Sequence, residues 1–276
     1  MLLLDFWRAE SVRFDAVLFD IDGTLVFGPR PLPGAAEFIS LLRHDGTPFF
    51  FLTNDGDHTR KQKSGFLTRA GIEADEREVI SCLSVLPDLV RRNGWEKGLF
   101  FQAGRLGDTG TLELTRDPAR LRECVAVLMG EGPYDWRTTW EALIGFFRHH
   151  PESPFIVPNP DTCWPNAATG ELGIGAGGQA RCIQLLLRDM GCAIEPVYLG
   201  KPYPAIYNYA AERLGLSDRS RILCVGDSLA SDIRGANNAG MYSALVLTGI
   251  TSGAQAERAL GEFRPRAVFD AVGLEV

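Results

Sequence analysis

Short apolar runs along this chain alternate with amphipathic segments, and several of the runs end abruptly in polar residues. The runs are rich in Val, Leu, Ile and Phe, which is typical of strands buried on both faces. The predicted strands cover residues 16–19, 48–52, 196–199, 221–225, 244–247 and 267–269. Predicted helices follow four of them and end near Arg43, Ala70, Leu214 and Ala239. This alternation predicts a parallel sheet with right-handed crossovers.

The rhythm is less regular between residues 80 and 189. Strands are predicted there at residues 99–102, 125–129 and 155–157, with a helix at 138–149 and a proline-rich loop at 158–165. Because the opening rhythm resumes afterwards, we interpret this region as inserted rather than appended. The prediction is an α/β protein: a Rossmann-like parallel-sheet core formed by residues 1–79 and 190–276, and an inserted α/β domain formed by residues 80–189.

The composition narrows the class of protein. The chain has 276 residues, of which 45% are hydrophobic and 23% charged, as in ordinary soluble globular proteins. A formal net charge of −7 argues against a nucleic-acid-binding surface, which needs clustered cations. One short basic run, Arg60-Lys61-Gln62-Lys63, is predicted to lie on a solvated helix face.

Cysteine spacing and hydropathy indicate in which cellular compartment the protein is expected. The six cysteines form no Cys-x-x-Cys pair, so neither a zinc cluster nor a disulfide scaffold is expected. The start of the chain has no basic region before its apolar residues, and no apolar run reaches the roughly 18 residues of a membrane span. We therefore expect a reduced, cytoplasmic protein that does not enter membranes.

Polar residues follow the ends of several predicted core strands. They are Asp20 and Asp22, Thr53 and Asn54, Asp227 and Asp232, and Lys201, which precedes a helix. The carboxyl ends of parallel strands meet at one edge of a sheet, so these residues are expected to share a site. Carboxylates at 20, 22 and 227 suit a hard cation such as Mg²⁺. Lys201, the polar groups of Thr53 and Asn54, and the N–H groups around Gly23 suit a phosphate, which indicates phosphoryl transfer.

The two first aspartates suggest different chemical roles. A carboxylate can attack phosphorus and form an aspartyl phosphate, which divides a difficult hydrolysis into two steps. Asp20, at the very end of its strand, is the better candidate for a metal-bound nucleophile. Asp22 could then protonate the leaving oxygen and later deprotonate the attacking water.

Four motifs resemble those of the haloacid dehalogenase superfamily. They are Asp20-Ile-Asp-Gly-Thr24, Thr53-Asn54, Gly200-Lys-Pro202 and Gly226-Asp-x₄-Asp232, in that order. The insertion between the second and third motifs resembles the large α/β cap of the NagD-like and 4-nitrophenylphosphatase-like subclass. The segment Asn159-Pro-Asp161, with Pro165 and Gly173-x-Gly-Ala-Gly177 after it, is similar to the cap loop of that subclass.

The resemblance implies a role for each residue. Asp20 is the implied nucleophile, and Asp22 the acid and base that also offers its backbone carbonyl to Mg²⁺. Thr53, Lys201 and Asn54 would bind the phosphoryl group, Asp227 would be a further metal ligand, and Asp232 would orient metal-bound water or Lys201. The cap would close over the site, and Asp161 would either contact the substrate or simply form a turn.

One position departs from the subclass, which usually has Thr-Asn-Asn where this chain has Thr53-Asn54-Asp55. An inward carboxylate would repel a polyanionic substrate, whereas an outward one would be harmless. Asp232 has a simpler alternative as well, because it could pair with Arg234 or cap a helix.

The expected function is a Mg²⁺-dependent phosphatase that acts on a small phosphorylated metabolite, with the cap setting specificity. One alternative is a phosphotransferase that uses the same aspartyl chemistry. Another is a binding or regulatory protein that keeps this fold and turns over poorly. The resemblance also allows a homodimer formed through the cap.

Overall fold

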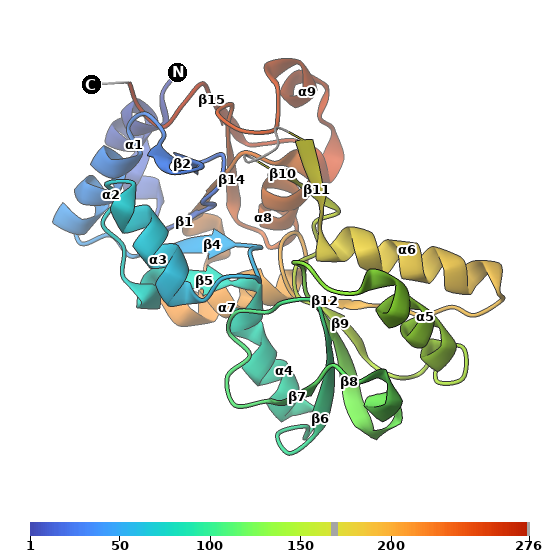
Figure 1. Ribbon diagram of the computed structural model, residues 1–276. Helices are drawn as coiled ribbons and strands as arrows, with labels where there is room; N and C mark the ends of the chain where they lie inside the picture. Colours follow the sequence, from blue (N-terminus) through green and yellow to red (C-terminus); the bar gives the residue numbers. More distant parts are fainter. Residues whose placement is uncertain (167–170, 275–276) are drawn as a thin grey trace. The chain divides into compact units, whose positions relative to one another are not determined.

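The computed structural model describes residues 1–166 and 171–274. The chain divides into two compact units (Figure 1). The first unit comprises Met1–Thr53, Arg60–Ser81 and Lys201–Val276, and the second comprises Asn54–Thr59 and Cys82–Gly200. Across the described parts of the chain, no helix combines the length and the apolar character needed to cross a membrane.

A six-stranded parallel sheet forms the centre of the first unit, in the order β15-β14-β13-β1-β4-β5. Its strands are β1 (Ala16–Phe19), β4 (Phe49–Thr53), β5 (Val79–Ser81), β13 (Ile222–Gly226), β14 (Tyr242–Val246) and β15 (Ala267–Phe269). Val17 of β1 aligns with Leu223 of β13 on one side and with Phe49 of β4 on the other. The prediction of a parallel-sheet α/β fold is confirmed.

Helices accompany this sheet in the first unit (Figure 1). They are α1 (Leu3–Glu10), α2 (Ala35–His44), α3 (Arg60–Arg69), α7 (Pro204–Leu214), α8 (Arg234–Asn238) and α9 (Gly253–Arg258). A short hairpin of β2 (Val26–Phe27) and β3 (Arg30–Pro31) follows β1. Alternate side chains of the strands, such as Val17 and Phe19, pack with those of α1, α2 and α3 in one apolar core. Three strands, β1, β4 and β13, thereby place the polar residues at their carboxyl ends along one edge.

The N-terminal helix α1 was not predicted from the sequence. Its Leu3, Leu4 and Trp7 are buried in the core of the first unit, and the Trp7 ring lies 5.5 Å from that of Phe38. The N–H groups of Leu3 and Leu4 donate to the carbonyl oxygens of Ala271 and Val272, at 3.1 and 2.9 Å. The beginning and the end of the described chain are therefore joined by backbone hydrogen bonds.

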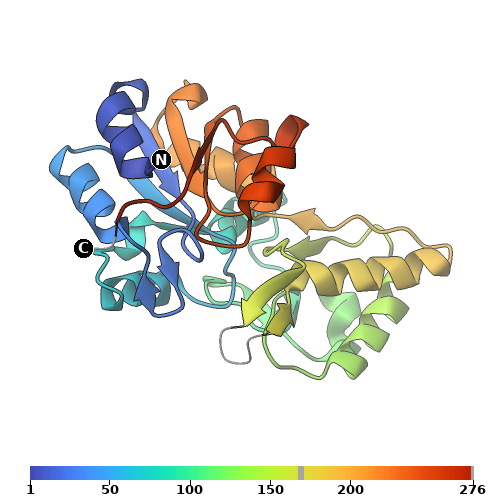
Figure 2. The same cartoon turned by 90° about the horizontal axis from the view of Figure 1, so that it is seen from above.

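The second unit has its own parallel sheet, in the order β12-β9-β8-β6-β7. Its strands are β6 (Leu99–Ala103), β7 (Glu113–Thr115), β8 (Cys124–Met129), β9 (Phe155–Val157) and β12 (Val197–Tyr198). The helices are α4 (Leu86–Arg92), α5 (Trp136–Phe147) and α6 (Ala176–Asp189). Figure 2 shows α5 and α6 side by side, and their apolar side chains share a core with those of β6, β8 and β9.

Two sequence predictions are wrong in this unit. The strand expected at residues 196–199 of the core sheet is β12, which pairs with β9 through Val197–Ile156 and Tyr198–Val157. This pairing places the residues up to Gly200 with the second unit, whereas the predicted core began at residue 190. The proline-rich loop contains a strand, β10 (Cys163–Asn166), which pairs antiparallel with β11 (Glu171–Ile174).

Removal of the Trp7 side chain should strongly destabilise the first unit. Trp7 is only 3% exposed, so Trp7→Ala leaves a cavity and loses its transfer free energy, about 3 kcal/mol in all. Chemical denaturation followed by fluorescence or circular dichroism would measure the change in the free energy of unfolding. Val12→Ala is the control, since Val12 is 84% exposed and should change stability by less than about 0.5 kcal/mol.

Candidate functional site

Lys201 lies between two aspartates at the strand ends of the first unit. Its Nζ is 2.5 Å from Oδ1 of Asp20 and 2.7 Å from Oδ1 of Asp232. Asp20 directly follows β1 and its N–H donates to the carbonyl oxygen of Val225, at 2.8 Å. The side chains of Lys201, Asp20 and Asp232 are only 4%, 11% and 7% exposed. Because so buried a charge is costly without a partner, this ion-paired group must form as a unit.

A third carboxylate, that of Asp227, joins Asp20 and Asp232. Oxygen atoms of the three lie within 4.8 Å of one another, and all three aspartates belong to the first unit. The Lys201 ammonium contacts two of these three carboxyl groups, those of Asp20 and Asp232. The excess of negative charge and the all-oxygen donor set fit a hard divalent cation such as Mg²⁺.

The pKa values in this group reflect its burial. Burial raises the pKa of Asp20 well above its ordinary value, and the charges of Asp232 and Asp227 add to that rise although Lys201 opposes it. Burial, together with the charge of Asp232, raises the pKa of Asp227 to about 7. Burial alone would lower the pKa of Lys201, but Asp20 and Asp232 raise it overall, so the ammonium stays protonated. A bound cation would therefore have to displace protons from the carboxylates.

The loop after β14 positions Asp227. The N–H of Ile250 donates to Oδ2 of Asp227, at 2.7 Å. Two glycines make room for this carboxylate: a Cβ on Gly23 would lie 2.5 Å from Oδ2 of Asp227, and one on Gly249 would collide with the same oxygen. Gly23 also has a φ of +91°, which disfavours any side chain, and its carbonyl oxygen accepts from Oγ1 of Thr248, at 2.7 Å.

A π-helical turn, Leu229–Ile233, positions Asp232. Oδ2 of Asp232 accepts from the N–H of Ser228 at 3.1 Å, while Oδ1 contacts Lys201. The buried hydroxyl of Tyr207 donates to the Asp232 carbonyl oxygen, at 3.2 Å. The alternative pairing of Asp232 with Arg234 does not occur, because Arg234 pairs with Glu262 at 2.9 Å.

The carboxylate of Asp22 is not part of the acidic group. Its side chain is 63% exposed, and its Oδ2 accepts a hydrogen bond from Nζ of Lys63, at 2.8 Å. The predicted solvated face is therefore wrong for Lys63, which is 5% exposed. The helical spacing of Lys63, Leu67 and Ala70, all buried, is the sequence signal that could have revealed it. The predicted contact of Asp22 with metal, through its backbone carbonyl, stays a prediction.

Thr53 ends β4 and is 3% exposed, so its hydroxyl is held at the same edge as Asp20. The next residue, Asn54, belongs by its contacts to the second unit together with Asp161. There Nδ2 of Asn54 donates to Oδ1 of Asp161, at 3.0 Å, and the N–H of Asp161 donates to Oδ1 of Asn159, at 2.9 Å. The described residues thus place the predicted site in two groups, one on each unit.

Glu131 supports the loop around Asp161 and was missed from the sequence. It accepts from Nδ2 of Asn159 and, at 3.3 Å, from the N–H of Ala176 at the start of α6. Burial raises the pKa of Glu131 to about 7, although these hydrogen bonds oppose the rise. The only sequence signal for Glu131 is its position shortly after the apolar run that forms β8.

Asp55, where the chain departs from Thr-Asn-Asn, stabilises a turn. Its Oδ1 accepts from the N–H groups of Asp57 and His58, at 2.9 and 3.1 Å. Its Oδ2 lies 2.9 Å from Nδ1 of His58. The carboxylate therefore has its partners within this turn.

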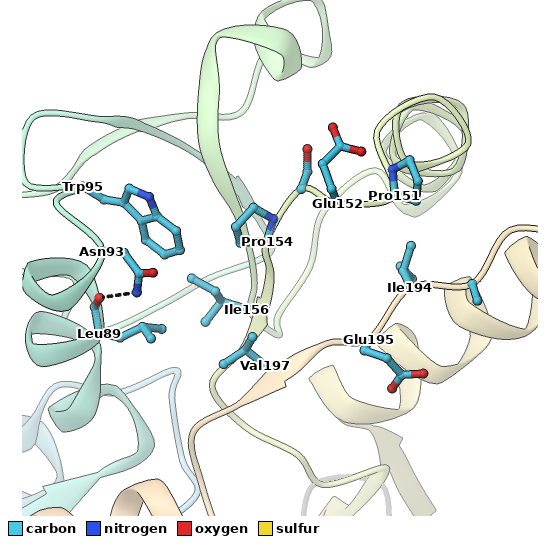
Figure 3. Close-up of a pocket in the computed structure, with 12 residues that line it drawn as sticks. Leu89, Asn93, Trp95, Pro151, Glu152, Pro154, Ile156, Ile194, Glu195 and Val197 are labelled. Carbon is cyan, nitrogen blue, oxygen red and sulfur yellow. Dashed lines mark hydrogen bonds between the residues drawn. The ribbon is translucent and has the colours of Figure 1, made fainter.

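A pocket of about 520 Å³ lies elsewhere in the second unit (Figure 3). Trp95, Pro154, Ile156 and Val197 are among its lining residues. None of the residues that line it is a predicted site residue, so its apolar wall has no part in the chemistry above.

Comparisons with known proteins agree with this fold. Residues 17–113 match the family of haloacid dehalogenase-like hydrolases, and residues 198–273 match the HAD-hydrolase-like family. An acid sugar phosphatase of Staphylococcus aureus is 28% identical over 241 residues, which cover 87% of this chain and 89% of that protein.

Two solved structures share the whole fold. NagD from E. coli K-12 is 25% identical, covers 94% of this chain and 97% of its own, and has a TM-score of 0.76. A glycerol phosphate phosphatase of Mycobacterium tuberculosis in complex with magnesium is 24% identical with a TM-score of 0.80, over 94% of this chain and 75% of that one.

The fold and the strand-end carboxylates define a hydrolase of the haloacid dehalogenase type, and the chain belongs to that superfamily. Within the superfamily it is a phosphatase-type enzyme similar to NagD.

The stability of the metal-free protein should fall as the pH rises towards about 7 and level off above it. The folded-state pKa of Asp227 is raised to about 7 from 3.8, so the folded protein holds a proton that the unfolded chain releases. Stability is therefore lost progressively as the pH rises from 3.8 to about 7, and the loss levels off once the folded protein releases the proton as well. Melting temperatures in chelator, between pH of about 5.5 and 8, should fall more steeply for wild type than for Asp227→Asn. Equal slopes would contradict this assignment.

Gly249→Ala should weaken divalent-cation binding by on the order of tenfold or more, because the added methyl group displaces the Asp227 carboxylate. Calorimetric titration with Mg²⁺ measures the affinity. Gly253→Ala is the matched control, since the nearest atom to its added Cβ lies 3.8 Å away. Unchanged Mg²⁺ affinity in Gly249→Ala would show that Asp227 does not bind the cation.

Proposed function

We propose that this enzyme hydrolyses a small phosphomonoester with the help of Mg²⁺, through an aspartyl phosphate on Asp20. The observation that supports it is the group of Asp20, Asp227 and Asp232 around the Lys201 ammonium at the strand ends. Asp20 and Asp227, with the backbone carbonyl of Asp22, would hold the cation. Mg²⁺ would supply neutralisation of charge on the phosphoryl oxygens.

The reaction is proposed in two steps. A carboxylate oxygen of Asp20 attacks phosphorus, the bond from phosphorus to the ester oxygen breaks, and Asp22 donates a proton to the leaving alcohol. Asp22 then takes a proton from water as that water attacks the phosphoaspartate, which releases inorganic phosphate and restores Asp20. Thr24, whose Oγ1 donates to Oδ2 of Asp20 at 3.3 Å, helps to orient the nucleophile.

Phosphate binding is assigned to Lys201, Thr53, Asn54 and the N–H groups around Gly23. Lys201 and Thr53 are held rigidly, since each is 3% exposed. Asp232 would keep the Lys201 ammonium in place through its 2.7 Å contact. Such fixed donors stabilise the charge of the transition state without reorganising.

The substrate class is proposed to be a phosphorylated sugar or polyol. Support comes from the likeness over most of the chain to an acid sugar phosphatase, and from the likeness in fold to a glycerol phosphate phosphatase. Asp161 accepts a hydrogen bond from Asn54 in the second unit, and it is the residue proposed to recognise the hydroxyl groups of the leaving alcohol by hydrogen bonding. Homodimerisation through the second unit stays a prediction.

Asp20→Asn should abolish phosphate release, because a neutral amide cannot attack phosphorus. Phosphate release is measured for sugar, glycerol and aryl phosphates, with Mg²⁺ and with chelator. Asp45→Asn, at an exposed helix end, is the control and should leave the rate unchanged. Metal-dependent release that persists in Asp20→Asn would contradict the proposed nucleophile.

The same panel separates the alternatives. A phosphotransferase would transfer the phosphoryl group to an added alcohol in preference to water. A binding protein would release no phosphate from any ester, while esters would still raise its melting temperature.

A further inference from the structure

Lys63 is a buried cation next to the predicted catalytic residues. It lies near the start of α3, on the helix face that carries Leu67 into the core of the first unit. Burial of an ammonium costs several kcal/mol unless it is paired, and a helix N-terminus further disfavours positive charge. An apolar residue would suit this position better for stability alone. Its presence therefore indicates a role in the site.

The contact of Lys63 is with the second aspartate. Its Nζ donates to Oδ2 of Asp22, at 2.8 Å. The backbone around Asp22 is already fixed, because Asp22 forms a β-bridge with Val26 and the N–H of Gly23 donates to the Val26 carbonyl oxygen, at 2.8 Å. The side chain of Asp22, in contrast, is 63% exposed and would otherwise sample several rotamers.

We propose that Lys63 is a positioning residue for proton transfer, which holds Oδ2 of Asp22 and so turns Oδ1 toward the reacting oxygen. This inference rests on the proposed function, because it concerns the step in which Asp22 protonates the leaving alcohol. A general acid must lie within about 2.6–3.2 Å of the atom it protonates. A residue that holds the Asp22 carboxylate in place has to be less mobile than Asp22 itself. Lys63 meets this condition because its side chain is buried and only 6% exposed.

The dependence on the leaving group tests this role. 4-Nitrophenolate is a stable anion and can leave with little protonation of its oxygen. The alkoxide of glycerol is strongly basic, so its oxygen must be protonated as it leaves. Lys63→Met should therefore lower kcat/KM for glycerol phosphate by on the order of 10- to 100-fold, and that for 4-nitrophenyl phosphate by much less. Lys61→Met, the same change at an exposed position of the same helix, should alter neither value.

A double-mutant cycle adds a second readout. If Lys63 acts through Asp22, Lys63→Met should cause no further loss in an Asp22→Asn background. Thermal unfolding should show that Lys63→Met is at least as stable as wild type, since a buried ammonium has been replaced by an apolar chain of similar length. Should this variant fail to fold, Lys63→Gln takes its place with the same expected kinetics.

Each outcome is decisive. Equal loss with both esters, or losses that multiply with Asp22→Asn, would overturn the positioning role while leaving the proposed function intact. Wild-type rates in Lys63→Met would overturn it as well. No metal-dependent release by the wild-type enzyme from either ester would instead overturn the proposed function, and this inference with it.

Discussion

The site of this enzyme depends on one ammonium shared by two carboxylates. Lys201 contacts Asp20, which is 181 positions away in the chain, and Asp232, which is 31 positions away. All three side chains are almost fully buried, so none could remain charged there without the others. The parallel sheet makes the arrangement possible, because it brings the ends of β1 and β13 to the same edge.

The carboxylates at this sheet edge outnumber the cationic group that balances them. Three carboxylates face one ammonium, and burial raises the pKa values of Asp20 and Asp227. Such a group is destabilising as an isolated structure, and it becomes favourable when a divalent cation balances the charge. Gly23 and Gly249 show that the surrounding backbone has been fitted closely around the Asp227 carboxylate. The clustered carboxylates therefore lower the stability of the fold, and phosphoryl transfer needs this concentration of charge.

Much of this could be predicted from the sequence. Five of the six core strands and the carboxylates that follow them were found because buried strands read as short apolar runs, and because polar residues directly after them must lie at the sheet edge; β5 was missed. The assignment of residues 196–199 to the core sheet failed for a related reason. A short apolar run indicates a strand, but its partner depends on register, and β12 pairs with β9.

Local pattern determined the parallel α/β fold, the order of the motifs and the positions of Asp20, Thr53, Lys201 and Asp227, since each lies within a few residues of a strand end. Only the tertiary structure decided which carboxylates come together and where their partners lie. The run from Arg60 to Lys63 is polar as a sequence, yet packing turns one of its lysines inward, toward Asp22. Helical spacing can indicate that Lys63 is buried, but its ion pair joins two distant segments, so no pattern within one segment identifies Asp22 as its partner.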